Sequence, residues 1–223
     1  MKRSGITNGI GFETDPGSFA FSEASLTPVF ELNGFFLELL AEAARYSTPK
    51  SRSWSAALRP EVTQLSAAAR ARIARCPVCL VDVGFQDEAR WGSQSLEHQP
   101  SEEISGLPPG RAIELTQMAV TLAWTIARES PVAACIIFGM TPDCVRRVSS
   151  LSLHRIPWLA ERNAPAIRPV GADRPQIWKH LLSLSDPPTA SRLPPLHVRA
   201  MQRQLAALSL ATGASPPIRQ PHR

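Results

Sequence analysis

The chain has 223 residues, 43% of them hydrophobic, and a formal net charge of +5 at pH 7; this composition excludes a wholly disordered chain and allows one large domain or one domain with an appendage. No apolar run approaches the roughly 18 residues of a membrane-spanning helix, and the polar stretch Met1 to Ala20 lacks the apolar core of a secretory signal. We therefore expect a cytoplasmic protein whose four cysteines are reduced.

The first part of the chain predicts a loose arm and then a long helix. Residues 1–26 are rich in Gly, Ser, Thr and Asn, which indicates a flexible N-terminal arm. A helix is expected from Pro28, with Thr27 as its cap, to about Tyr46. The charged residues of this helix are Glu31, Glu38, Glu42 and Arg45. Their spacing places them in one narrow stripe along the helix.

The next segment predicts one more helix and a loop. A helical zone rich in alanine runs from Pro60 to about Arg75, and Pro77 ends it. The apolar run Cys79 to Phe85 fits an extended segment or a buried turn, and its periodicity does not decide between them. Gly92 to Gly110 is polar and punctuated by Pro and Gly, which indicates a long loop or a boundary.

A second long helix is predicted from Arg111 to Arg128, and it repeats the stripe of the first. The polar residues at the same spacings are Glu114, Thr121, Thr125 and Arg128. Two helices that each leave only a thin stripe in water need burial on nearly every side. We therefore expect a layered bundle or, as the less favoured alternative, a homodimer face.

The segment Pro131 to Val148 has the register of a helix-turn-helix. With Pro131 at position 1, Cys135 falls at position 5, where the first helix needs a small buried residue. Gly139 falls at position 9, where the chain turns with positive φ. Val145 and Val148 occupy the inward positions of the second helix.

The second helix of this segment has a polar start and a polar outer face. Thr141 can cap it ahead of Pro142. Asp143, Arg146 and Arg147 then point outward, on the face that such a motif lays in a major groove. From residue 141 to residue 180, Lys and Arg outnumber Asp and Glu by seven to three, which favours a polyanionic partner.

The last part of the chain also predicts helices. A helix over Leu153 to Asn163 tolerates Pro157 if it begins near His154, because the missing N–H is then one of the first unpaired donors. Further helices are expected over 174–184 and 194–211, and the Pro-rich tail from residue 213 is expected to be disordered. The inward residues of the 174–184 helix are Ile177, Trp178, Leu181 and Leu182.

These elements predict an all-α helical bundle with a helix-turn-helix-like unit near 131–150. Four regions are expected along the chain: an N-terminal arm (1–26), an N-terminal helical region (27–110), a helical region with the turn motif (111–184), and a C-terminal helix with its tail (185–223).

Read without gaps, residues 122–169 resemble the FlhD family, the D subunit of the bacterial flagellar master transcriptional activator. The order helix, Gly turn, short helix, Leu-x-Leu and Leu-Ala-Glu helix is kept. The residues that carry the resemblance are Leu122, Ala123, Ala134, Gly139, Leu151, Leu153, Leu159, Ala160, Glu161 and Asn163, with apolar matches at Ile126, Phe138, Val148 and Ile156.

The resemblance implies an all-helical subunit that dimerises, joins a zinc-binding second regulator subunit and acts at promoters. This chain departs from the family at Pro157, Pro165 and Pro169, and about 120 residues precede the match.

Other chemistry is weakly indicated. Cys76 and Cys79 have the CxxC spacing of a metal or redox site, but two buried core cysteines are the favoured interpretation. The five histidines are scattered, and Asp82, Asp87 and Glu88 fit a solvated turn better than acid-base catalysis. We therefore expect no enzyme activity, no catalytic residues, no metal and no cofactor.

Two function hypotheses follow. The first is a DNA-binding transcriptional regulator or regulator subunit, with DNA as the partner. Its expected groove residues are Thr141, Asp143, Arg146 and Arg147, and its expected phosphate contacts are Arg155 and Arg162. The second is a helical interaction or adaptor protein without DNA contact.

Overall fold

The described part of the chain is almost entirely helical, which confirms the predicted all-α fold. The structure is a computed structural model that describes residues 23–46, 62–91, 107–172, 178 and 181–182. Its α-helices are α1 (Glu23–Tyr46), α3 (Ala67–Ala74), α4 (Pro109–Glu129), α5 (Pro131–Phe138), α6 (Pro142–Ser149) and α7 (Ile156–Asn163). Short 3-10 turns are η1 (Glu88–Trp91), η3 (Leu153–Arg155) and η4 (Ala164–Ala166), and the two-residue strands are β1 (Val81–Asp82) and β2 (Arg168–Pro169).

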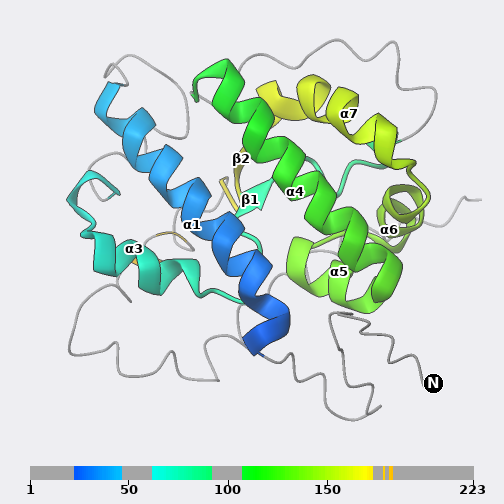
Figure 1. The fold of residues 1–223 in the computed structure, drawn as a ribbon, viewed down its shortest axis with the longest axis horizontal. Helices are drawn as coiled ribbons and strands as arrows, with labels where there is room; N and C mark the ends of the chain where they lie inside the picture. The colour runs from blue at the N-terminus through cyan, green and yellow to red at the C-terminus, as the bar shows by residue number, and fades with distance from the viewer. Residues whose placement is uncertain (1–22, 47–61, 92–106, 173–177, 179–180, 183–223) are drawn as a thin grey trace, which may run out of the picture.

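Helix α4 is the element on which the others pack. Helices α1, α5, α6 and α7 all contact it, and in Figure 1 it runs between α1 on one side and α7 on the other. Several of its buried side chains are small, including Ala112, Ala119, Ala123 and Ala127. Small side chains at the contacts allow neighbouring helix axes to approach closely.

The polar stripes of the two long helices lie outward. Glu31, Glu38, Glu42 and Arg45 are exposed on α1, and on α4 Glu114 and Arg128 are exposed while Thr121 and Thr125 are half-buried. Most of the other side chains of these helices enter one hydrophobic core that extends from Leu26 to Leu182. Packing within a single chain, as in a layered bundle, therefore provides most of the burial that both helices need.

Helix α1 begins five residues before the predicted start at Pro28. Glu23 is its first residue, so Thr27 is an exposed helical residue and not the cap. Burial of Leu26 and Val29 in the core outweighs the missing backbone hydrogen bond at Pro28, which lies inside the helix. Tertiary packing here overrides the local start signal of Thr27 and Pro28.

The predicted helix from Pro60 to Arg75 is interrupted. Residues 65 and 66 are not helical, and the Ser66 hydroxyl accepts a hydrogen bond from the Ala69 N–H at 3.1 Å, which starts α3 afresh. Serine competes with helical backbone bonds in this way.

The segment after α3 contains both of the conformations that its sequence left open. Strand β1 pairs antiparallel with β2, with Val81 opposite Pro169, and a turn follows at Gly84, whose φ is 85°. The Asp82 carboxylate accepts from the Gly84 N–H at 2.8 Å. The Asp87 carboxylate accepts from the Ala89 N–H at 3.1 Å, so the acids of this stretch serve turns, as predicted.

Asn33 of α1 fastens this segment to the core. Its buried amide nitrogen lies 3.3, 3.1 and 2.9 Å from the carbonyl oxygens of Ala74, Cys76 and Val78, to which it donates. Its oxygen accepts from the Leu80 N–H at 2.8 Å. The two N–H groups of the amide are shared among the three carbonyl oxygens, so one side chain contacts four buried backbone groups.

Two eight-residue helices pack on the long helices, α3 on α1 and α5 on α4. The 3-10 turn η1, which follows β1 and Gly84, contacts α6. The segment after α3 therefore meets the second helix of the turn motif.

The C-terminal part agrees with the prediction where it is described. Helix α7 begins at Ile156 after η3, so Pro157 lies in its first turn. Trp178, Leu181 and Leu182 are buried, and the rings of Trp178 and Phe36 meet edge to face at 6.2 Å. Residue 177, the helix over 194–211, the arm over 1–22, most of the loop (92–106) and the tail lie outside the described residues.

Candidate nucleic-acid interface

The two short helices α5 and α6 meet at a tight turn whose geometry follows from its sequence. The Ser130 hydroxyl accepts from the Ala133 N–H at 3.2 Å and caps α5. Gly139 ends that helix with φ 64° and ψ 28°, the left-handed conformation that glycine adopts at little cost. The Thr141 hydroxyl then accepts from the Cys144 N–H at 3.1 Å, with Pro142 in the first turn of α6. The predicted turn and cap are confirmed.

Burial within the unit matches the predicted register at all but one position. Val145 and Val148 are buried, as expected. Cys135, predicted to be the small buried residue of α5, is only half-buried. Ala134, one position earlier, is fully buried and takes that place, because α5 turns Ala134 and Ile137 toward the core.

The outer face of α6 is polar. Pro142, Arg146 and Arg147 are exposed and Asp143 is half-buried. Arg146 pairs with Asp143 one turn earlier, but its side chain remains 73% exposed, and exposed pairs of this kind contribute little. Arg147 forms no ion pair with any residue that the structure describes. Both guanidinium groups are therefore within reach of an incoming ligand.

The charge along α6 is uneven. The thiol of Cys144, in the first turn, has a raised pKa because it is buried and because the carboxylates of Glu88 and Asp87 lie nearby. The carboxylates of Asp87 and Glu88 therefore lie nearer the first turn of α6, and Arg146 and Arg147 occupy its last turn. A polyanion would meet positive charge mainly at the C-terminal half of this helix.

The two remaining predicted residues, Arg155 and Arg162, converge on one tryptophan. Their guanidinium carbons lie 5.9 and 5.4 Å from the ring centroid of Trp158, a distance typical of cation–π contact. Trp158 is 39% exposed, and Leu153 in the preceding turn is 60% exposed. Sequence reasoning missed Trp158, although the spacings of three and four residues from the arginines place all three on one helix face.

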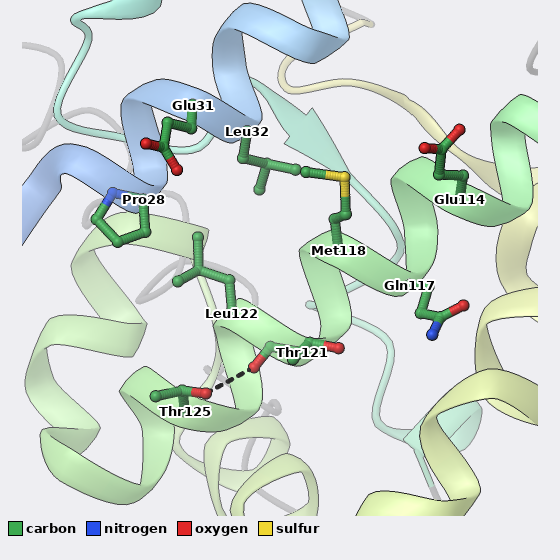
Figure 2. A pocket seen from close by; sticks show the side chains of 9 residues that line it. All are labelled: Pro28, Glu31, Leu32, Glu114, Gln117, Met118, Thr121, Leu122 and Thr125. Carbon is green, nitrogen blue, oxygen red and sulfur yellow. Dashed lines mark hydrogen bonds between the residues drawn. The ribbon is translucent and has the colours of Figure 1, made fainter.

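A groove between α1 and α4 is a separate surface feature, shown in Figure 2. Its volume is about 510 Å³, and Leu32 and Met118 point toward each other across it. Met118 is 40% exposed. Glu114 at its edge is paired with Arg111 at 2.7 Å, and Thr125 donates to the Thr121 carbonyl. Glu31 and Gln117 also line the groove, and Leu32, Met118 and Leu122 form its apolar part.

Three of the four cysteines are core residues in this structure. Cys76, Cys79 and Cys144 are buried, and all four thiols are free. Burial raises the pKa of Cys76 to about 11 and that of Cys79 to about 12, so neither is a nucleophile near neutral pH. Within the described residues, no group of three or more His, Cys, Asp or Glu side chains has the arrangement of a metal site.

Comparisons with protein-family models, with curated proteins and with solved structures find no match to this chain. Among the described helices, none is both long and apolar enough to cross a bilayer.

Proposed function

We propose that this chain is a DNA-binding transcriptional regulator or regulator subunit, and that α6 is the helix that enters the major groove. The observation that carries the proposal is the α5–α6 unit itself. Two eight-residue helices are joined by a three-residue turn with a left-handed glycine, and an exposed arginine pair lies on the outer face of the second. This is the arrangement that helix-turn-helix proteins use for base readout.

In this proposal the residues have distinct roles. Arg146 and Arg147 donate to guanine edges or phosphates, and Asp143 orients Arg146 and can accept from a cytosine amino group. Thr141 acts through its cap, because its hydroxyl oxygen is already bonded to the Cys144 N–H. Arg155 and Arg162 supply phosphate contacts beyond the helix.

The resemblance to the FlhD family supports the same function. Its ordered features coincide with the end of α4, with α5, Gly139 and α6, and with the Leu-x-Leu segment before α7. A homodimer and a second regulator subunit belong to the proposal on that basis alone.

The test is a fluorescence anisotropy titration of labelled duplex DNA at several salt concentrations. Affinity for a specific site should fall steeply with salt. Replacing both residues, Arg146→Ala with Arg147→Ala, should weaken binding by about 1 to 3 kcal/mol for each base that the arginines read. Arg45→Ala, on the exposed stripe of α1, is the control and should have a smaller effect. Unchanged binding by the α6 double variant would contradict the proposal.

A helical interaction protein is the second candidate, and the apolar groove between α1 and α4 with its exposed Met118 favours it. Exposed apolar grooves of this kind accommodate partner helices. In this case a second copy of the chain occupies the groove, and Met118→Glu shifts sedimentation from dimer to monomer at micromolar concentration. A chain that sediments as a monomer throughout, or a dimer that Met118→Glu does not alter, would rule out this use of the groove.

A further inference from the structure

The turn between α5 and α6 is covered by a distant part of the chain. Gly139 and Met140 are buried and Thr141 is half-buried, so the turn itself presents little surface. A Cβ atom added at Gly139 would lie 3.7 Å from the side-chain amide nitrogen of Gln86. Gln86 belongs to the segment between β1 and η1 and is exposed. The surface at the N-terminal end of α6 is therefore formed in part by Gln86.

The backbone on both sides of Gln86 is held in place. Phe85 is fully buried, and its ring meets the ring of Phe138 edge to face at 5.2 Å. Phe138 is the last residue of α5, so this contact fixes the segment beside the turn. On the other side of Gln86, the Asp87 N–H donates to the Gly84 carbonyl at 3.0 Å. A side chain on such a fixed backbone can take part in recognition without a rearrangement of the chain.

The Gln86 amide has unused hydrogen-bonding capacity. It forms no hydrogen bond with any residue that the structure describes. A glutamine amide both donates and accepts, and this pair of groups matches the N7 acceptor and N6 amino group of adenine in the major groove. A phosphate is a poorer neighbour here, because the carboxylates of Asp87 and Glu88 lie near the first turn of α6. The neutral amide therefore suits a base edge better than the DNA backbone.

We infer that Gln86 is a specificity-determining residue that reads an adenine beside the bases that α6 contacts. The inference rests on the proposed function, in which α6 lies in the major groove. In helix-turn-helix proteins the N-terminal residues of the recognition helix contact base edges. A side chain that covers the turn before this helix lies at the same groove. The DNA-reading surface then combines α6 with the segment between β1 and η1.

The length of α6 limits how far apart these contacts can fall. Its eight residues rise about 12 Å, and at about 3.4 Å per base pair this length spans roughly three to four base pairs. Arg146 and Arg147 occupy the last turn of the helix, whereas Gln86 lies beside the turn that precedes it. The adenine and the bases that the arginines read should therefore lie within about four base pairs of each other.

The test begins with the selection of binding sites from a library of random duplex DNA by the full-length chain. Anisotropy titrations then compare the selected site with its single-base-pair variants. Gln86→Ala should weaken binding to the selected site by about five- to 150-fold, and it should accept all four base pairs about equally at one A·T position. Gln86→Met keeps a long side chain over Gly139 but lacks the amide, and it should lose the same preference.

The controls separate a base contact from packing. Gln64→Ala removes another exposed glutamine, in the helical residues before α3, and it should bind like the wild type. Thermal melting followed by circular dichroism shows which variants keep their fold. If Gln86→Ala does not fold, Gln86→Met decides the question, because its side chain still covers the turn.

The proposed function and this inference fail in different ways. Binding that depends on Arg146 and Arg147 but is unchanged within twofold in Gln86→Ala would overturn the inference and leave the function standing. So would an equal loss of affinity for every base-pair variant, which indicates a phosphate contact, or a wild-type adenine preference in Gln86→Met, which indicates packing. A wild-type chain that binds duplex DNA without sequence preference would also overturn the inference. A wild-type chain that binds no duplex DNA would overturn the proposed function and the inference with it.

Discussion

The most informative stability test concerns Asn33, because this one side chain connects α1 to the segment that supports the turn motif. Its side-chain N–H groups donate hydrogen bonds to the carbonyl oxygens of Ala74, Cys76 and Val78. Its side-chain oxygen accepts a hydrogen bond from the Leu80 N–H. In the same segment the Cys79 N–H donates to the Ile137 carbonyl of α5 at 2.8 Å. Removal of the Asn33 amide should therefore also destabilise the turn at Gly139.

The expected cost of Asn33→Ala is about 3 to 5 kcal/mol. The substitution leaves one buried N–H without its partner, at about 1 to 3 kcal/mol, and removes a donor from three carbonyl oxygens, each of which keeps a smaller penalty. A typical domain is stable by only about 5 to 15 kcal/mol, so the variant should be marginal. The assay is urea unfolding followed by circular dichroism.

Thr116→Val is a matched control for this test. Thr116 is equally buried on α4, but its hydroxyl donates at 2.7 Å to the Ala112 carbonyl of its own helix. Its removal should cost only about 0.5 to 1.5 kcal/mol. If Asn33→Ala loses no more stability than Thr116→Val, the hydrogen bonds of Asn33 do not hold the segment as argued.

Two further predictions concern the turn and the thiols. Gly139→Ala should lower the free energy of unfolding in urea by about 1 to 2 kcal/mol, because the backbone is left-handed there and the added Cβ would meet only the Gln86 side chain at 3.7 Å. Gly139→Asn should lower it less. A Gly139→Ala variant as stable as the wild type would contradict a positive φ at this residue. Burial in the folded state raises the pKa of Cys76 from 9.0 to about 11 and that of Cys79 to about 12. The contribution of the two protonated thiols to the free energy of unfolding is therefore complete below pH 9 and is lost as pH rises toward 12. The loss is up to about 1.4 kcal/mol per pH unit for each thiol. Unfolding at stepped pH should show this decline, and Cys76→Ala with Cys79→Ala should flatten it; an equal slope in the double variant would contradict the burial argument. A thiol reagent at pH 8 should label half-buried Cys135 first.

The sequence by itself determined the local features of this protein. The Gly139 turn, the Thr141 cap and the first-turn positions of Pro142 and Pro157 depend on steric and hydrogen-bonding preferences that act within a few residues. The extent of α4 and the inward positions of Val145 and Val148 follow from helical periodicity, which is also written in the local order of residues.

Only the tertiary structure decided the features that join distant residues. The early start of α1 and the placement of Ala134 instead of Cys135 in the core depend on packing against other helices, which periodicity along one segment does not reveal. The same holds for the four bonds of Asn33, which bridge more than 40 residues, and for the pairing of β1 with β2. The cluster of Arg155, Trp158 and Arg162 lies between these cases: its spacing is local, but only the fold shows that the ring stays exposed.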